Sequence, residues 1–76
     1  MNTMDKVKEI IAGQLGIEAD AVADDMNIMD DLGADSLDIV EMLLSIEESL
    51  GITVPDSDAA NLKTVRDIAD YVEKNS

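Results

Sequence analysis

Apolar residues recur at the spacing of an α-helix in three parts of the chain. The first run covers about residues 3–15 and the second about residues 36–50, and each stops directly before a glycine, Gly16 and Gly51. The third run begins after Thr64 and carries an apolar stripe made of Val65, Ile68, Ala69 and Val72. The pattern predicts three main helices, because glycine readily adopts the left-handed conformation that ends a helix.

The segments between these runs carry weaker signals. Residues 17–35 show no sustained period, and loops of this length are uncommon in compact domains and often functional. Pro55 prevents a helix through residues 52–55, and a short helix is expected over residues 57–61. The predicted fold is all-α, a small four-helix bundle of three main helices and one short helix, with the long loop between the first two. A chain of 76 residues has room for one domain, residues 1–76.

Polar residues suited to helix capping stand at the start of each predicted helix. In chain order the candidates are Thr3, then Asp35 or Ser36, then Asp56 and Thr64. Thr64 is followed three residues later by Asp67, which is the spacing of a capping box.

The second predicted helix has two apolar faces. A helix advances about 100° per residue, and one wide arc, suited to the core, contains Ile39, Met42, Leu43, Ile46 and Leu50. A smaller arc begins beside Ser36 and contains Leu37, Val40 and Leu44, with Glu41, Glu47 and Glu48 at its edges. An apolar centre within a charged rim is typical of interaction surfaces. The alternative is that a neighbouring helix buries this smaller arc.

Charge and composition narrow the classes of function. The 18 acidic and 5 basic residues give a net charge of −13, which opposes binding to nucleic acid and to anionic membranes and favours partners with basic patches. The chain has no cysteine and no histidine, which excludes disulfides, His/Cys metal sites and the Ser-His and Cys-His catalytic pairs. No apolar run is long enough to span a membrane. We therefore expect a soluble, intracellular protein that is not an enzyme.

The acidic loop before the second helix raises the question of a calcium site. Its candidate ligands are Asp24, Asp25, Asn27, Asp30 and Asp31. In an EF-hand spacing that starts at Asp25, Met29 and Asp30 occupy the places of an oxygen ligand and a glycine. No dedicated metal site is predicted, and a solvated acidic loop is favoured over weak, diffuse binding of divalent cations.

Ser36 is the remaining chemical candidate, because it stands among carboxylates where the polar loop gives way to the second helix. A nucleophilic serine needs an adjacent base, and no histidine is available. A helix N-terminus presents free N–H groups and a positive dipole end, which accommodate phosphate. The residues alone leave two readings open: Ser36 caps the helix, or it is an attachment point.

The segment DLGADSLD at residues 31–38 resembles the attachment motif of acyl carrier proteins, and the resemblance covers essentially the whole chain. Further matching landmarks are Val7-x-x-Ile10-Ile11, Gln14-Leu15-Gly16, Glu41, Glu47-Glu48, Pro55-Asp56 and Asp70-Tyr71. The resemblance implies that Ser36 receives 4′-phosphopantetheine from coenzyme A through a separate phosphopantetheinyl transferase. The thiol of that arm would then carry acyl groups as thioesters.

The resemblance also implies two groups of binding residues. Those on the partner-recognition surface are Asp35, Leu37, Asp38, Val40, Glu41, Leu44, Glu47 and Glu48. Those lining an acyl pocket are Ile46, Val54, Ala59, Leu62 and Ile68. The chain departs from many members where Ile28 and Leu50 replace phenylalanine, which alters the acyl cavity, and where Leu44 replaces methionine.

The expected function is that of a free-standing, monomeric, cytoplasmic carrier that delivers acyl intermediates to enzymes of fatty acid biosynthesis. A polyketide or other specialised acyl carrier is the alternative within the family. Outside it, the alternative is a non-enzymatic acidic adaptor or a bundle that binds divalent ions.

Overall fold

The computed structural model describes residues 2–75, which form a bundle of helices. In chain order the elements are α1 (Thr3–Leu15), the 3-10 turn η1 (Ala19–Ala21), α2 (Ser36–Leu50), α3 (Asp56–Ala59) and α4 (Val65–Asn75). The three main helices and the short one confirm the predicted all-α fold. No helix of the described chain is long and apolar enough to cross a membrane.

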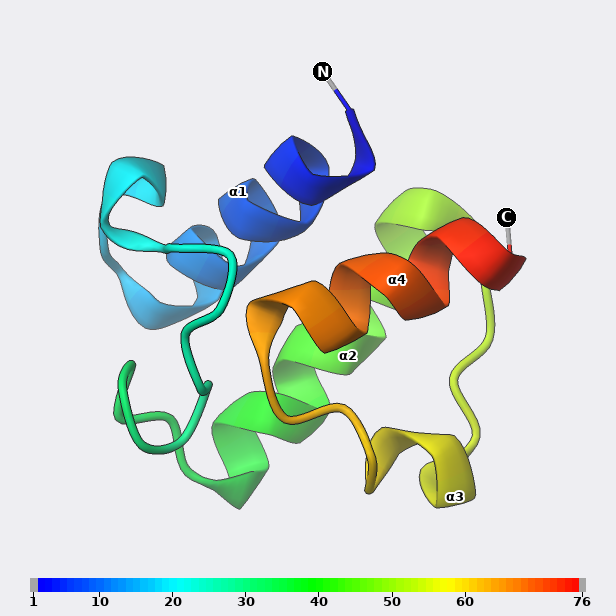
Figure 1. Ribbon diagram of the computed structural model, residues 1–76. Helices are drawn as coiled ribbons and strands as arrows, with labels where there is room; N and C mark the ends of the chain where they lie inside the picture. The colour runs from blue at the N-terminus through cyan, green and yellow to red at the C-terminus, as the bar shows by residue number, and fades with distance from the viewer. Residues whose placement is uncertain (1, 76) are drawn as a thin grey trace.

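The core lies among the three main helices, and α1 packs against both α2 and α4 (Figure 1). Its fully buried larger side chains are Val7, Ile11, Ile28, Met42, Ile46, Val65 and Ile68. All four residues of the predicted stripe on α4 are buried. The short helix α3 lies at the edge of the molecule, in the connection between α2 and α4 (Figure 1).

The ends of α1 and α2 are fixed by local chemistry, and one predicted cap is wrong. The Asn2 side chain, not Thr3, caps α1 and accepts a hydrogen bond from the Asp5 N–H at 2.8 Å. Thr3 is already helical, so the residue before it is the one whose side chain reaches the free N–H groups of the first turn. Gly16 and Gly51 end α1 and α2 at φ values of 70° and 68°, as predicted for left-handed glycines.

Of the caps predicted for the last two helices, the one at Thr64 is confirmed and the one at Asp56 is wrong. Thr64 and Asp67 form the predicted capping box, with both hydrogen bonds at 3.1 Å. Asp56 does not cap α3, because the helix already begins at Asp56 and ends at Ala59. The Pro55 carbonyl accepts hydrogen bonds from the N–H groups of Asp58 and Ala59, and no side chain caps this helix.

The long loop of residues 17–35 is more ordered than its sequence suggests. After η1, it runs beside the start of α4, where Asn27 and Thr64 form an isolated antiparallel bridge. The Ile28 N–H donates to the Lys63 carbonyl at 2.9 Å, and the Val65 N–H donates to the Met26 carbonyl at 3.1 Å. This pairing joins segments far apart in sequence and holds the loop that leads into α2.

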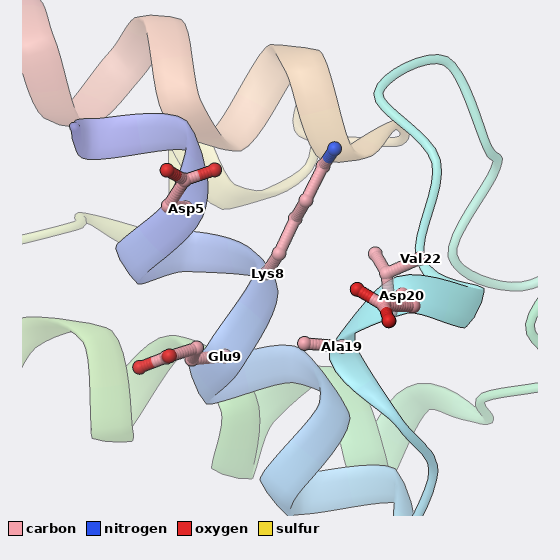
Figure 2. Close-up of a pocket in the computed structure, with 6 residues that line it drawn as sticks. All are labelled: Asp5, Lys8, Glu9, Ala19, Asp20 and Val22. Carbon is pink, nitrogen blue, oxygen red and sulfur yellow. The ribbon is translucent and has the colours of Figure 1, made fainter. Parts of the chain in front are cut away.

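A pocket of about 320 Å³ lies between α1 and the η1 segment (Figure 2), and no residue of the 31–38 motif lines it. Its lining residues are Asp5, Lys8, Glu9, Ala19, Asp20 and Val22. The lining is mostly charged, and it contains none of the predicted site residues.

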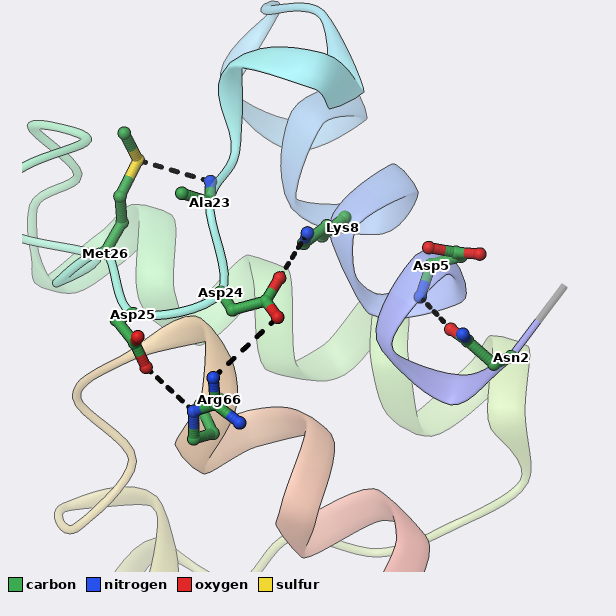
Figure 3. Close-up of polar contacts among 8 residues, drawn as sticks. All are labelled: Asn2, Asp5, Lys8, Ala23, Asp24, Asp25, Met26 and Arg66. Carbon is green, nitrogen blue, oxygen red and sulfur yellow. Dashed lines mark hydrogen bonds and ion pairs between the residues drawn. The ribbon is translucent and has the colours of Figure 1, made fainter.

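An ionic cluster fastens the loop of residues 17–35 to α1 and α4 (Figure 3). Asp24 pairs with Lys8 of α1 and, at 3.8 Å, with Arg66 of α4, while Asp25 accepts a hydrogen bond from Arg66 Nε at 2.7 Å. The hydrogen bond from Lys8 lowers the pKa of the Asp24 carboxyl, and the charge of Arg66 adds to the effect.

One further acidic side chain of the loop, Asp31, and the amide side chain of Asn27 hold its backbone. Asp31 Oδ2 accepts a hydrogen bond from the Asn27 N–H at 2.8 Å, and Asn27 Oδ1 accepts from the N–H groups of Met29 and Asp30 at 2.9 Å. Within residues 2–75, no three or more acidic, histidine or cysteine side chains are grouped to hold a metal ion. Asp24 and Asp25 thus act as ion-pair residues, and Asp31 as a turn residue.

The Asp24 pairing predicts a pH-dependent contribution to stability. Because the folded-state pKa is below the ordinary value of 3.8, the contribution is present above that value and is lost as the pH falls through the folded pKa. Asp24→Asn should therefore lower the free energy of unfolding near pH 6, and the difference from the unaltered protein should shrink towards about pH 3. Urea denaturation at both pH values measures it.

Asp20→Asn is the matched control, since it removes one exposed carboxylate that has no ion pair in the described chain. A protein with this net charge should be unharmed or slightly stabilised by that change. An Asp24→Asn difference that is equally large at both pH values would contradict the role given to Asp24.

Candidate functional site

Ser36 is the first residue of α2, and its hydroxyl is free. The side chain is exposed and makes no hydrogen bond within residues 2–75. Asp35 caps the helix instead: its Oδ1 accepts from the Asp38 N–H at 2.9 Å, and the Asp35 N–H donates to Asp38 Oδ2 at 3.2 Å. The reading of Ser36 as the cap is therefore wrong, because Ser36 is already helical and the capping box of Asp35 and Asp38 satisfies the helix start.

The backbone before Ser36 is held in place from the loop side. Gly33 has a φ of 72°, a left-handed conformation that suits glycine. Ala34 is buried, and its N–H donates to the Ile28 carbonyl at 3.1 Å. The serine is thus an exposed side chain on a backbone fixed from both sides.

The smaller apolar arc of α2 is open to solvent. Leu37, Val40 and Leu44 are 66%, 54% and 51% exposed, so the alternative that a neighbouring helix buries them is wrong. The wide arc packs inward as predicted, with Met42 and Ile46 fully buried. One helix therefore serves the core on one side and presents an apolar patch next to Ser36 on the other.

The carboxylates around this patch differ in how free they are. Glu48 is exposed and has no hydrogen bond or ion pair in the described chain. Glu41 accepts a hydrogen bond from Gln14 Nε2 at 2.8 Å, and the half-buried Glu47 accepts one from the Val54 N–H at 2.9 Å. Asp35 and Asp38 are engaged in the capping box. Within residues 2–75, no lysine or arginine pairs with any of these five carboxylates.

Two pockets lie beside α3. The larger, of about 430 Å³, is lined by Asn27, Met29, Asp30, Ile39, Ala59, Ala60, Leu62 and Lys63. The smaller, of about 90 Å³, is lined by Val40, Leu43, Leu44, Glu47, Val54, Asp56 and Ala59. Ala59 lines both, and Val40 and Leu44 join the smaller pocket to the exposed patch.

The five residues predicted to line an acyl pocket fall into two groups. Val54, Ala59 and Leu62 line one or both of these pockets. Ile46 and Ile68 lie in the core, 0% and 2% exposed, and line neither. Sequence reasoning assigned Asn27 and Met29 to no pocket, because they reach the larger pocket through the long-range pairing of the loop.

Comparison with known proteins places the chain in a family. The family model described as the phosphopantetheine attachment site matches residues 5–72. An acyl carrier protein of Bdellovibrio bacteriovorus is 54% identical over 69 residues, which span 91% of this chain and 88% of that protein. An acyl carrier protein of Syntrophobacter fumaroxidans is 47% identical over 70 residues, 92% of this chain and 86% of the relative.

A solved structure agrees over the full length. The acyl carrier protein of Enterococcus faecalis, in a structure described for its high thermal stability, superimposes with a TM-score of 0.81 at 40% identity and full coverage of both chains. This small helical domain is of the kind that accepts a phosphopantetheine arm. The chain belongs to the acyl carrier protein family, and its cofactor is covalently attached 4′-phosphopantetheine.

Proposed function

We propose that Ser36 is the residue that bears the 4′-phosphopantetheine arm, and that a separate phosphopantetheinyl transferase attaches it from coenzyme A. The observation that carries this proposal is the exposed Ser36 hydroxyl at the start of α2, which has no partner in residues 2–75. Because Asp35 meets the demands of the helix start, joining a group to Ser36 breaks no hydrogen bond of the fold.

The attachment chemistry divides between the chain and the transferase. The Ser36 oxygen bonds to the phosphate of phosphopantetheine, and the pyrophosphate of coenzyme A breaks to release its adenosine bisphosphate part. The chain has no histidine to take the hydroxyl proton, so the base belongs to the transferase. The N-terminus of α2 favours the resulting phosphodiester, while Asp35 and Asp38 oppose it, so the transferase must also supply cations. When bound, the cofactor supplies a thiol that holds acyl groups as thioesters.

Ser36→Ala should abolish arm attachment. The protein is incubated with coenzyme A and a phosphopantetheinyl transferase of broad specificity, and its intact mass is measured. The unaltered protein should gain the mass of one arm, and Ser36→Ala should gain none.

Ser57→Ala is the matched control, because Ser57 is also an exposed serine in the first turn of a helix, α3. It should gain the arm as the unaltered protein does. A full mass gain on Ser36→Ala, or none on the unaltered protein, would refute the assignment.

We propose that the exposed face of α2 is the docking surface for partner enzymes. Its centre is Leu37, Val40 and Leu44, and its acidic rim is Asp35, Asp38, Glu41, Glu47 and Glu48. The support is that the centre is more than half exposed and that no basic side chain of the described protein neutralises the rim. A partner with a basic patch around an apolar contact complements such a surface and is steered towards it.

Charge reversal at Glu48 tests the docking surface most cleanly, since Glu41 and Glu47 also make hydrogen bonds within the protein. Glu48→Lys should slow association with the transferase or an acyl-transferring enzyme by about tenfold at low salt, with a smaller effect at high salt. Stopped-flow association kinetics measures this.

Glu18→Lys is the matched control, because it makes the same charge change at an exposed residue before η1. It should slow association much less, through the net charge alone. Equal slowing by the two variants would contradict a docking surface on α2.

We propose that an acyl chain lies in the pockets beside α3, against Val54, Ala59 and Leu62, with the core residues Ile46 and Ile68 behind them. The support is that both pockets carry aliphatic side chains and that the smaller one opens on the face that begins at Ser36. Such a lining suits the hydrocarbon chain of fatty acid synthesis, and we propose that the protein acts as a monomer in that cytoplasmic pathway. The acyl chains on protein isolated from its native cell test this proposal. Polyketide intermediates in place of fatty acyl chains would identify a polyketide carrier instead.

An acyl chain in these pockets should be visible by NMR spectroscopy. When the acetyl form is replaced by the octanoyl form, methyl signals of Val54, Ala59 and Leu62 should shift. The methyl signals of Ile11, which lies in the core on α1, serve as the control and should stay in place. Equal shifts at all sites, or none, would contradict the pocket assignment.

A further inference from the structure

The methionine side chains of the protein differ widely in exposure. Met29 is 52% exposed, whereas Met42 is fully buried in the core. Met4 and Met26 are half-buried and pack against the core, and Met26 Sδ also accepts a backbone hydrogen bond within the loop at 3.4 Å (Figure 3). Met1 lies outside the described residues. Of the methionines that the structure describes, Met29 is therefore the one most accessible to solvent.

Met29 lies in a tight turn whose backbone is held by polar side chains. Its N–H donates to Asn27 Oδ1 at 2.9 Å, and the Asn27 N–H donates to Asp31 Oδ2 at 2.8 Å. The Met29 side chain is not part of the hydrophobic core of the described chain. A change confined to this side chain therefore leaves the hydrogen bonds of the turn in place and removes no core packing.

The Met29 side chain also lines the pocket of about 430 Å³. Ile39, Ala59 and Leu62 are among its apolar neighbours there. Lys63 lines the pocket as well and forms no ion pair in the described chain. One apolar side chain of this lining is thus both accessible to reagents in water and close to a hydrated cation.

A thioether in such a position is open to a two-electron oxidation. A hydroperoxide transfers one oxygen to the methionine sulfur: the O–O bond breaks, a sulfur–oxygen bond forms, and the sulfur loses two electrons. The hydroperoxide is reduced to water, or to an alcohol where it is organic. The sulfoxide that forms is polar, and methionine sulfoxide reductases convert it back to the thioether. Burial protects a sulfur atom, because the peroxide must reach its lone pair.

We propose that Met29 is a reversible oxidation site, and that its sulfoxide makes one wall of the larger pocket polar. The sulfoxide oxygen and the Lys63 ammonium group then both hold water, which an acyl chain has to displace in order to enter. This second step rests on the proposed acyl pocket. Through it, a hydroperoxide weakens the hold of the protein on an acyl chain without unfolding the protein.

Peroxide titration of the protein without an arm tests the site. Oxidation precedes arm attachment, because the thiol of the arm is itself oxidised by peroxide. Tandem mass spectrometry of peptides should find the first oxygen of residues 2–75 on Met29. Met4 and Met26 should need higher doses, and Met42 should stay unmodified in the folded protein. Methionine sulfoxide reductases should remove the oxygen from Met29.

Two substitutions control for selectivity. Met29→Leu keeps an apolar side chain of similar volume and removes the sulfur, so residues 2–75 should show no oxidation at the dose that modifies Met29 in the unaltered protein. Met26→Leu is the matched control, since Met26 belongs to the same loop and does not line the pocket. Met29 should be oxidised in it as in the unaltered protein. First oxidation at another described methionine would overturn the site.

NMR spectroscopy of the loaded protein tests the effect on the pocket. Of the two pockets beside α3, Leu62 lines the larger and Val54 the smaller. Oxidation of Met29 should lower the occupancy of the larger pocket by an octanoyl chain about tenfold, the order expected for removing water from a polar group. The shift of the Leu62 methyl signals between the acetyl and octanoyl forms should therefore fall, and that of Val54 should remain.

The outcomes distinguish the oxidation site, the pocket and the carrier function. An unchanged Leu62 shift after complete oxidation of Met29, or an equal loss of shift at Val54, would overturn the effect on the pocket. In Met29→Leu, the Leu62 shift should be the same before and after peroxide treatment. A failure of arm attachment to Ser36 would overturn the proposed function, while peptide mapping of the arm-free protein would still decide whether Met29 is the oxidation site.

Discussion

The paired hydrogen bonds between Asp35 and Asp38 fix where α2 begins, and the functional surface depends on that start. They satisfy the first free N–H groups of the helix and leave the next side chain, Ser36, without a structural task. From that point, the turn of the helix buries Met42 and Ile46 and turns Leu37, Val40 and Leu44 outwards. A free hydroxyl and an exposed apolar patch thus lie on one rigid element.

Two of the five basic residues, Lys8 and Arg66, form ion pairs away from this surface. The cluster that fastens the long loop pairs Lys8 with Asp24, and Arg66 with Asp24 and Asp25. These ion pairs therefore hold the long loop, and the carboxylates of α2 remain available to a basic partner. The net charge of −13 works against compactness, and the buried aliphatic core has to offset it.

Local signals made most of the fold predictable. Helical spacing and the glycines at 16 and 51 gave α1 and α2, because side-chain period and left-handed glycine act within a few residues. The pairing of Asn27 with Thr64 was missed, since a single bridge between distant segments leaves no pattern in either one.

The site was predictable to a similar degree. The exposed patch followed from the two arcs of α2, whereas the free state of Ser36 required the geometry of the Asp35 cap. The pocket residues Asn27 and Met29 were beyond sequence reasoning, because only the folded loop brings them to α3.

The hydrogen bond from the Val54 N–H to Glu47 has a consequence for recognition. It fixes the rotamer of a carboxylate whose second oxygen remains available at the edge of the patch. A long acidic side chain normally loses rotational freedom when a partner binds it, and that loss reduces affinity. The Glu47 side chain has already lost part of its rotational freedom on folding, whereas the Glu48 side chain loses it when a partner binds. Two neighbouring glutamates of equal charge can therefore differ in thermodynamic character, one preorganised and one adaptable.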